Sequence, residues 1–334
     1  MQTKAFPCLH PDLLRNVWTP ANSDENYGYL FILYINRMKI LEVLLKTVFT
    51  CFDKFLKGSP FGKQTRRAFL NGTLVAGTLC ILIGSLTGCK NQHTLVWSDE
   101  FNYSGSPDST KWNYDLGDGC PNVCGWGNNE LQFYTNIPNN VRVENGVLII
   151  EAHKDSLGGK AYTSTRIVSK NKGDWLYGRI EVRAKLPRGK GTWPGIWMLS
   201  TDWHYGGWPE SGEIDIMEHV GFNPGVIHGT IHTKKYNHIS QTQKEGIITM
   251  EDCQDEFHSY AIDWQENKID FFVDDQLYHS VVRNAEDDFT GWPFDKRFHL
   301  IMNIAVGGNW GGMQGVDDSI WPQRMEIDYV RVYQ

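Results

Sequence analysis

Beyond residue 94 the chain is a succession of short segments in which apolar and polar residues alternate. The alternation is regular in Val141–Glu144 and Ile180–Lys185, with the period of two that is typical of a half-buried β-strand. Turns that contain Gly or Pro divide the segments, as at Leu186–Gly189 and Val306–Asn309. The pattern predicts an all-β sandwich or barrel in one domain, with strands within 95–101, 141–154, 162–170, 178–187, 196–200, 213–218, 226–233, 257–265, 268–276, 298–306 and 325–334.

One segment breaks the alternation. In Glu213–Glu218 (EIDIME), Glu213 and Asp215 share a face of the strand, whereas Glu218 belongs to the opposite face. One extra residue, inserted as a β-bulge near Ile216–Met217, restores the register and brings the three carboxylates onto one face. The two glutamate α-carbons are then about 13 Å apart, and side chains that lean together can approach the ~5–5.5 Å between the carboxyl groups of retaining glycosidases. From spacing alone, a solvated acidic strand edge or a calcium site explains the segment equally well.

Charge and aromatic content narrow the class of ligand. The 334 residues carry a formal net charge of −7, but residues 1–89 hold ten basic and five acidic side chains, so residues 90–334 carry −12. An acidic body argues against nucleic acid as a partner. Twelve of the 13 tryptophans lie beyond residue 89. Indole rings beside carboxylates suit a neutral ligand with apolar faces, and a sugar ring is such a ligand.

The first 89 residues have the character of a leader. Arg66-Arg67 precedes an apolar run over residues 68–88 that ends at Cys89, and a basic region followed by apolar and small residues is typical of an export signal. The stretch TRRAFL resembles a twin-arginine signal, and LTGC resembles the lipobox of bacterial lipoproteins, in which the cysteine is lipidated. The run is also long enough for a transmembrane anchor. We expect an N-terminal extension over 1–65, an export signal over 66–89 and a folded domain over 90–334, exported and lipid-anchored at the outer membrane or cell surface.

The three cysteines beyond residue 89 indicate a candidate disulfide, and two acidic residues near the ends of the domain indicate a candidate metal site. In an exported protein, Cys120 and Cys124 are expected to form a local disulfide, which leaves Cys253 free. Three scattered cysteines lack the second pair that a zinc site needs. If the first and last strands are neighbours, as the termini of compact domains often are, Glu100 and Asp328 can supply oxygens to a structural Ca²⁺.

Sequence blocks around the acidic segment change its interpretation. They are WSDEFN (97–102), WGNNELQFYT (126–135), YGRIEVRAKLPRG (177–189), GTWPGIWML (191–199), WPF (292–294), NIAVGGNW (303–310) and PQRMEIDYVRVY (322–333). Together with WPESGEIDIMEHVG they resemble glycoside hydrolase family 16, specifically its bacterial laminarinase-like endo-β-1,3-glucanases. The resemblance runs from about Trp97 to the C-terminus. It implies a jelly-roll β-sandwich of two curved antiparallel sheets, with the active site on the concave face.

The same resemblance implies roles for individual residues. Glu213 matches the nucleophile, Glu218 the general acid and base, and Asp215 the residue between them that tunes both. Independently of the resemblance, three carboxylates on one face cannot all ionise cheaply, so at least one pKa should be raised. The positions that match substrate contacts in the family are Trp193, Trp197, Trp208, Asn129, Glu181, Arg183 and His232.

Some of these matches have structural alternatives. Trp197 stands in an apolar run and equally suits core packing, and Glu181 and Arg183 can be a surface ion pair of little energetic value. An isolated histidine such as His232 is usually structural. The calcium site of the family matches Glu100, the backbone of Gly146, and Asp328. The insertion CPNVC at 120–124 departs from the shared pattern.

The resemblance implies an endo-acting, retaining hydrolase of β-1,3-glucan or mixed β-1,3/1,4-glucan that needs no cofactor for catalysis. The expected partner is then a β-glucan, and the expected contact with the membrane is through a lipid anchor. The protein is expected to be a monomer. A non-catalytic glycan-binding sandwich is the alternative from another class, and binding without product over a panel of β-glucans would favour it. Within the enzyme class, the alternatives are that the protein cuts galactans such as agarose or carrageenan, or that it transfers chains instead of hydrolysing them. The products released from several polysaccharides would distinguish these alternatives from glucan hydrolysis.

Overall fold

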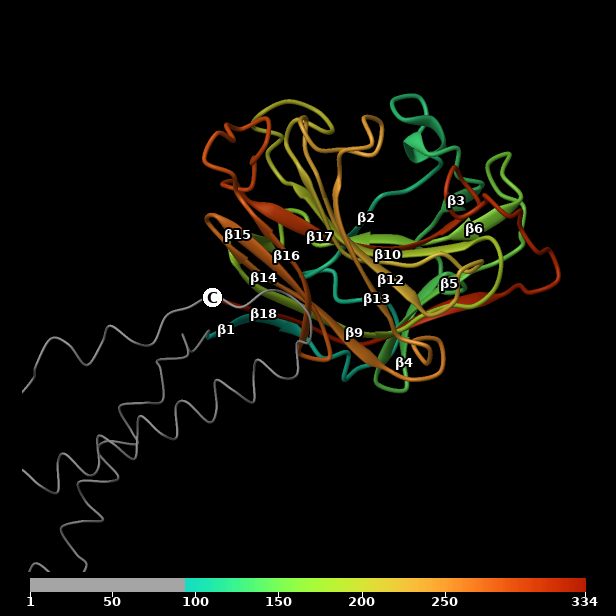
Figure 1. The fold of residues 1–334 in the computed structure, drawn as a ribbon. Helices are drawn as coiled ribbons and strands as arrows, with labels where there is room; N and C mark the ends of the chain where they lie inside the picture. Colours follow the sequence, from blue (N-terminus) through green and yellow to red (C-terminus); the bar gives the residue numbers. More distant parts are fainter. Residues whose placement is uncertain (1–93) are drawn as a thin grey trace, which may run out of the picture. The chain divides into compact units, whose positions relative to one another are not determined.

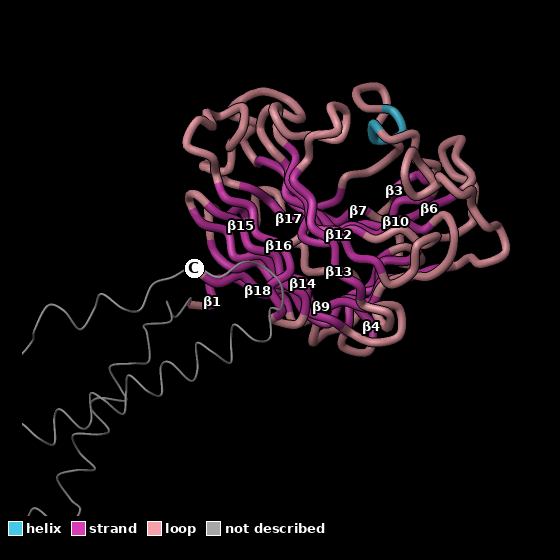
Figure 2. Tube along the Cα trace, viewed as in Figure 1, coloured by secondary structure: helices cyan, strands magenta, loops and turns pink. Residues whose placement is uncertain are grey.

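The computed structural model describes residues 94–334, and strands account for nearly all of its regular structure (Figure 2). A short 3-10 turn lies at Cys124–Gly127. Within the described residues, no helix is long and apolar enough to cross a membrane. The predicted extension over 1–65 and export signal over 66–89, with Cys89, lie outside this part of the chain.

Two large antiparallel sheets form the sandwich (Figure 1). Sheet A has the order β16-β15-β14-β9-β18-β5-β4, with β1 also beside β18. Its strands are β1 (Leu95–Asp99), β4 (Val141–Glu144), β5 (Val147–Ala152), β9 (Gly178–Lys185), β14 (His258–Gln265), β15 (Lys268–Val273), β16 (Gln276–Val282) and β18 (Gln323–Tyr333).

Sheet B has the order β13-β12-β11-β10-β17-β7-β2, with β8 also beside β17. Its strands are β2 (Asn113–Tyr114), β7 (Arg166–Val168), β8 (Asp174–Trp175), β10 (Thr192–Ser200), β11 (Glu213–Glu218), β12 (Val226–His232), β13 (Lys244–Thr249) and β17 (Phe298–Val306). A separate parallel pair joins β3 (Gln132–Tyr134) to β6 (Tyr162–Ser164). The predicted all-β, two-sheet sandwich is confirmed.

Each segment that the alternation predicted contains a strand, but several strands were missed. Three of them, β2, β3 and β8, have only two or three residues. The longer ones are β13 and most of β16, each of which lies at the edge of its sheet. Edge strands bury less apolar surface, and β13 alternates only between half-buried and exposed positions. Its hydrophobic signal is therefore weaker than that of the central strands.

The two sheets bury one common core between them. In β9 the apolar residues Ile180 and Val182 are fully buried, whereas Glu181 between them is half-buried. Ile196 of β10 and Ile214 of β11 belong to the same cluster from the opposite sheet. Complete burial of such a side chain contributes about 1.5–3 kcal/mol to stability, so this layer fixes which face of sheet B points away from the core.

A β-bulge sits in the middle of β11. Opposite β10, Asp215 pairs with Trp197 and Met217 pairs with Ile196, so Ile216 has no partner. The register opposite β12 also shifts between Asp215 and Glu218. Ile216 and Met217 are both buried in the core, and Glu218 therefore returns to the face that Glu213 and Asp215 share. The bulge predicted from the spacing of the carboxylates is confirmed.

The chain after the bulge is pinned to the neighbouring strand. The amide of His219 donates to the carbonyl of Pro194 (3.3 Å), and that of Gly221 donates to the carbonyl of Thr192 (2.9 Å). A β-carbon on Gly221 would lie 1.9 Å from the carbonyl oxygen of Gly189. Glycine thus allows the close approach that holds the end of β11 in register.

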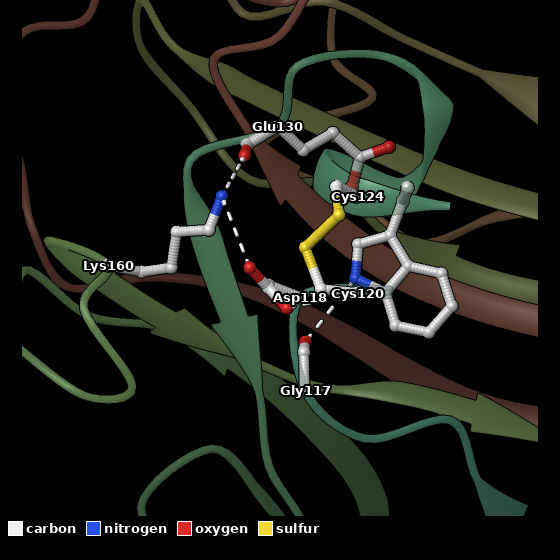
Figure 3. The surroundings of a disulfide bond; sticks show 7 residues. Gly117, Asp118, Cys120, Cys124, Glu130 and Lys160 are labelled. Atoms are coloured by element: carbon white, nitrogen blue, oxygen red, sulfur yellow. Dashed lines mark hydrogen bonds and ion pairs between the residues drawn. A yellow bond between two sulfur atoms is a disulfide. The ribbon is translucent and has the colours of Figure 1, made fainter. Parts of the chain in front are cut away.

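Cysteine pairing follows the prediction. A disulfide joins Cys120 to Cys124 in an exposed loop (Figure 3). Cys253 is buried and free. In Figure 3, Lys160 reaches the same loop, with its Nζ 3.2 Å from the carbonyl oxygen of Glu130 and 3.8 Å from Asp118 Oδ2.

Candidate active site

Glu213 lies at the start of β11, on the face of sheet B that points away from the core. Its side chain is 16 % exposed, and its Oε2 accepts a hydrogen bond from the indole Nε1 of Trp208 (3.0 Å). Burial raises the pKa of Glu213 to about 7, although the Trp208 bond, a hydrogen bond from Asp215 and the positive charge of Arg166 each oppose the rise. All three opposing influences favour the carboxylate.

Glu218 lies beyond the bulge on the same face. Its Oε1 accepts a hydrogen bond from the indole Nε1 of Trp193 (3.0 Å). Burial raises the pKa of Glu218 to about 7, and the negative charge of Glu213 is the next largest cause of the rise. The two glutamates therefore differ in their surroundings, because an ionised Glu213 makes Glu218 hold its proton.

Asp215, between the two glutamates, is the most deeply buried carboxyl group of the three, with 2 % of its side chain exposed. Burial, followed by the charges of Glu213 and Glu218, raises its pKa well above the usual range. The Nε2 atom of His232 lies 3.3 Å from Asp215 Oδ2 and 3.9 Å from Glu213 Oε1. Because burial lowers the pKa of His232 to about 4, that imidazole is neutral near pH 7 and does not draw the proton off Asp215.

Trp197 belongs to the site face as well as to a small apolar cluster. Its indole Nε1 donates to Asn303 Oδ1 (2.7 Å), and the guanidinium of Arg166 lies 4.7 Å from its ring centroid. The ring packs against Leu199 and Ile301. The packing interpretation of Trp197 is therefore confirmed, and its position beside the carboxylates leaves the substrate contact a prediction.

The face continues past Glu218 through residues that no sequence argument assigned. Trp310 packs edge-on against Trp193 (5.6 Å between centroids) and against His228 (4.9 Å). His228 in turn bonds Glu245 through Nδ1 (2.7 Å). Trp310 belongs to the NIAVGGNW block. That block supported the resemblance to the family, but the sequence did not indicate which of its side chains reaches the site.

Asn129 lies at the border of this aromatic group. It is exposed, and its Nδ2 donates to Asn309 Oδ1 (2.8 Å) beside Trp310. The structure thus brings together beside the three carboxylates most of the predicted substrate residues: Trp193, Trp197, Trp208 and His232. Asn129 lies farther out and is linked to them through Asn309 and Trp310.

The structure places Glu181 and Arg183 elsewhere, and this part of the prediction is wrong. Both lie on β9 in sheet A, where their side chains point away from the core and from sheet B. Glu181 pairs with Arg179 (2.8 Å), and Arg183 pairs with Asp328 (2.5 Å). Alternation distinguishes inward from outward positions, but it does not tell which of two sheets a strand joins.

The predicted calcium positions lie near the point where β18 changes partner. β18 pairs with β5 up to Ile327 and with β1 from Val330, which brings Glu100, after β1, and Gly146, before β5, toward Asp328. The neighbouring first and last strands are thus confirmed. Arg331 bonds both oxygens of Glu100 (3.0 and 2.7 Å), so a cation would compete with arginines for the acidic side chains.

One compact donor group among the described residues could hold a metal ion. Glu213, Asp215 and His232 each offer a donor atom, and the three atoms lie within 4.8 Å of one another. Metal ligands must be deprotonated, whereas burial favours the protonated form of both carboxyl groups. The arrangement therefore suits proton transfer better than metal binding.

Comparison with known proteins agrees with this site. Residues 128–331 match the model of "Glycosyl hydrolases family 16". A β-glucanase of Rhodothermus marinus is 53 % identical over 277 residues, covering 80 % of this chain and 94 % of the relative.

Two crystal structures resemble the described domain. The laminarinase from Rhodothermus marinus has a TM-score of 0.70 and 54 % identity, over 73 % of this chain and 98 % of that one. The E144S mutant of SCLam, a non-specific endo-β-1,3(4)-glucanase co-crystallised with 1,3-β-D-cellotriosyl-glucose, has a TM-score of 0.69 and 48 % identity, over 73 % of this chain and 95 % of that one. With its bulged carboxylate strand, its jelly-roll fold and these matches, the chain belongs to glycoside hydrolase family 16.

Proposed function

We propose that this protein is an endo-acting, retaining hydrolase of β-1,3-glucan or mixed β-1,3/1,4-glucan. The observation that carries the proposal is the unequal environment of two glutamates on one face. Burial raises both pKa values to about 7, and each glutamate has one indole bond that favours its ionised form. Arg166 and Asp215 further favour an ionised Glu213, whereas the charge of Glu213 helps to keep a proton on Glu218. A carboxylate beside a carboxylic acid is what a two-step glycoside hydrolysis requires.

The first step is a displacement at the anomeric carbon. Glu213 attacks C1 of the sugar, while Glu218 gives its proton to the departing glycosidic oxygen. A covalent glycosyl ester on Glu213 results, and the shortened glucan leaves with a new hydroxyl group. Asp215 keeps its proton and orients the attacking carboxylate by a hydrogen bond.

The second step reverses these roles. Glu218, now a carboxylate, takes a proton from water, and the hydroxide attacks C1 and breaks the ester to Glu213. Two inversions return the β configuration. Both carboxyl groups recover their original protonation, so no cofactor is consumed.

Sugar rings would stack on the indoles that flank the carboxylates. Trp208 and Trp193 each direct an N–H toward a glutamate, which leaves ring faces for the apolar faces of glucose. The named activities of the β-glucanase, laminarinase and endo-β-1,3(4)-glucanase relatives support a glucan rather than a galactan.

Replacing each glutamate by its amide tests the assignment. We expect Glu213→Gln to abolish the release of reducing ends from laminarin, and Glu218→Gln to slow it by about 10²–10⁴-fold, because a positioned proton donor is lost. Both amides are isosteric with the buried acids, so the unfolding midpoint should change little. Full activity of a folded Glu213→Gln protein would refute the proposal, and glucan binding without any product from the wild type would favour the non-catalytic alternative.

The two indole bonds allow the limbs of the pH profile to be assigned. The rate kcat/KM should be bell-shaped, falling at low pH as Glu213 gains a proton and at high pH as Glu218 loses one. Each indole bond lowers the pKa of its glutamate. Trp208→Phe should therefore move the acidic limb to higher pH and Trp193→Phe the alkaline limb to higher pH, each by up to about one unit. If both variants moved the same limb, the roles given to the two glutamates would be wrong.

A structural calcium ion at the β1–β18 junction is a further part of the proposal. The carbonyl of Gly146 and the carboxylates of Glu100 and Asp328 are the oxygen donors, supported by the strand register that brings them together. Calcium chloride should then raise the melting temperature over that in EDTA, and Asp328→Asn should remove the difference. Equal melting temperatures in both buffers would exclude the site.

We also propose that the protein is exported and lipid-anchored through Cys89. The basic, apolar and small residues of 66–89 support this part. Mass spectrometry of the mature N-terminus should find a lipidated Cys89, and Cys89→Ala should release the enzyme from the membrane fraction. An unmodified Cys89 in the mature protein would refute the anchor.

A further inference from the structure

The loop 117–131 carries a disulfide that the mechanism does not use. Cys120 and Cys124 are both exposed, so small thiols can reach the bond (Figure 3). The residues that follow have an unusual backbone: Gly125, Trp126, Gly127 and Asn129 all have φ between 52° and 80°. A tryptophan in the left-handed region is unfavourable and persists only where its surroundings over-determine it.

Trp126 is connected to the site face by a stack. The guanidinium of Arg166 lies 4.6 Å from the Trp126 ring and 4.7 Å from the Trp197 ring, so it sits against both indoles. Arg166 also supplies the positive charge that favours the ionised form of Glu213. The position of Trp126 therefore bears on both a sugar-contacting surface and a carboxylate.

A second connection runs from the same loop to Trp310. The carbonyl of Asn128 accepts from the amide of Asn309 (2.7 Å), and the side chain of Asn129 bonds that of Asn309 (2.8 Å). Trp310 follows Asn309 and packs on Trp193, which bonds Glu218. The loop thus supports the aromatic surfaces on both sides of the carboxylates.

The disulfide limits the freedom of this loop. The cross-link closes a five-residue ring just before the left-handed residues. The amide of Val123, inside the ring, donates to the carbonyl of Gly119 just before it (2.7 Å), and a β-carbon on Gly119 would lie 2.1 Å from the carbonyl oxygen of Val123. Without the cross-link, the loop has more conformations available in which Trp126 leaves Arg166.

We propose that the Cys120–Cys124 disulfide is a redox-sensitive positioning element that holds loop 117–131 against Arg166 and Asn309 and thereby tightens the binding of glucan. The inference rests on the proposed glucanase function. Reduction by a dithiol breaks the S–S bond, adds two electrons and two protons to give two thiols, and converts the dithiol to its cyclic disulfide. The chemistry at Glu213 and Glu218 needs neither sulfur. Asp115, which lies outside the loop, pairs with Arg166 (3.0 Å) and keeps its charge beside Glu213 when the loop loosens. The effect therefore falls on KM rather than on kcat.

The test compares oxidised wild type, wild type reduced with dithiothreitol, and Cys120→Ser/Cys124→Ser with and without dithiothreitol. We expect KM for laminarin to rise about three- to tenfold in the last three samples, while kcat changes less than twofold. Dithiothreitol should have no further effect on the double variant, which excludes a contribution from buried Cys253. Trp126→Ala should reproduce the rise in KM and make it insensitive to reduction.

Hydrogen exchange provides a readout that does not depend on activity. Reduction should speed exchange of the amides in 117–131 and 307–312, but not of those in the central strand β17. An unchanged KM together with unchanged exchange would overturn the inference while the enzyme remained a glucanase. If oxidised wild type released no reducing ends at all, the proposed function would fail instead, and the exchange data would still decide whether the disulfide orders the loop.

Discussion

The extra residue Ile216 in β11 is the constraint on which the site depends. Without the bulge, a strand with carboxylates at 213, 215 and 218 would turn one of them into the apolar core, where an ionised group costs far more than the strand pairing returns. With it, Ile216 and Met217 both point inward and the three acids share one face. The close packing of Gly221 on Gly189 and Thr192 then keeps the shifted register from relaxing.

Burial of the three carboxyl groups is the second requirement, and it is an electrostatic one. Desolvation is the largest cause of the raised pKa for each of them, but it does not distinguish one from another. Trp208 and Trp193 each lower the pKa of one glutamate, so they do not distinguish the pair either. The distinction comes from charge: the positive charge of Arg166 lowers the pKa of Glu213, and the negative charge of Glu213 raises that of Glu218. Catalytic asymmetry therefore arises from tertiary contacts around a nearly symmetrical pair.

The sequence predicted those parts of the arrangement that depend on residues close together in the chain, and it did not predict those that depend on contacts between distant segments. The bulge was predictable because charge and apolar pattern conflicted within six neighbouring residues. Glu181 and Arg183 were misplaced because a strand's own pattern does not reveal its sheet, and Arg166, Asn303 and Trp310 were missed because their contacts cross from other strands and loops. The edge strand β13 escaped notice because little of its surface is buried.

The eleven-residue strand β18 has a consequence for the order in which the domain forms. It is an interior strand of sheet A, bordered by β9 on one side and by β5 and then β1 on the other. All three partners are synthesised well before residues 323–333. A growing chain can therefore pair the hairpin of β4 and β5 early, but sheet A stays divided until β18 is made, which leaves the inner faces of both sheets exposed to chaperones or aggregation during synthesis.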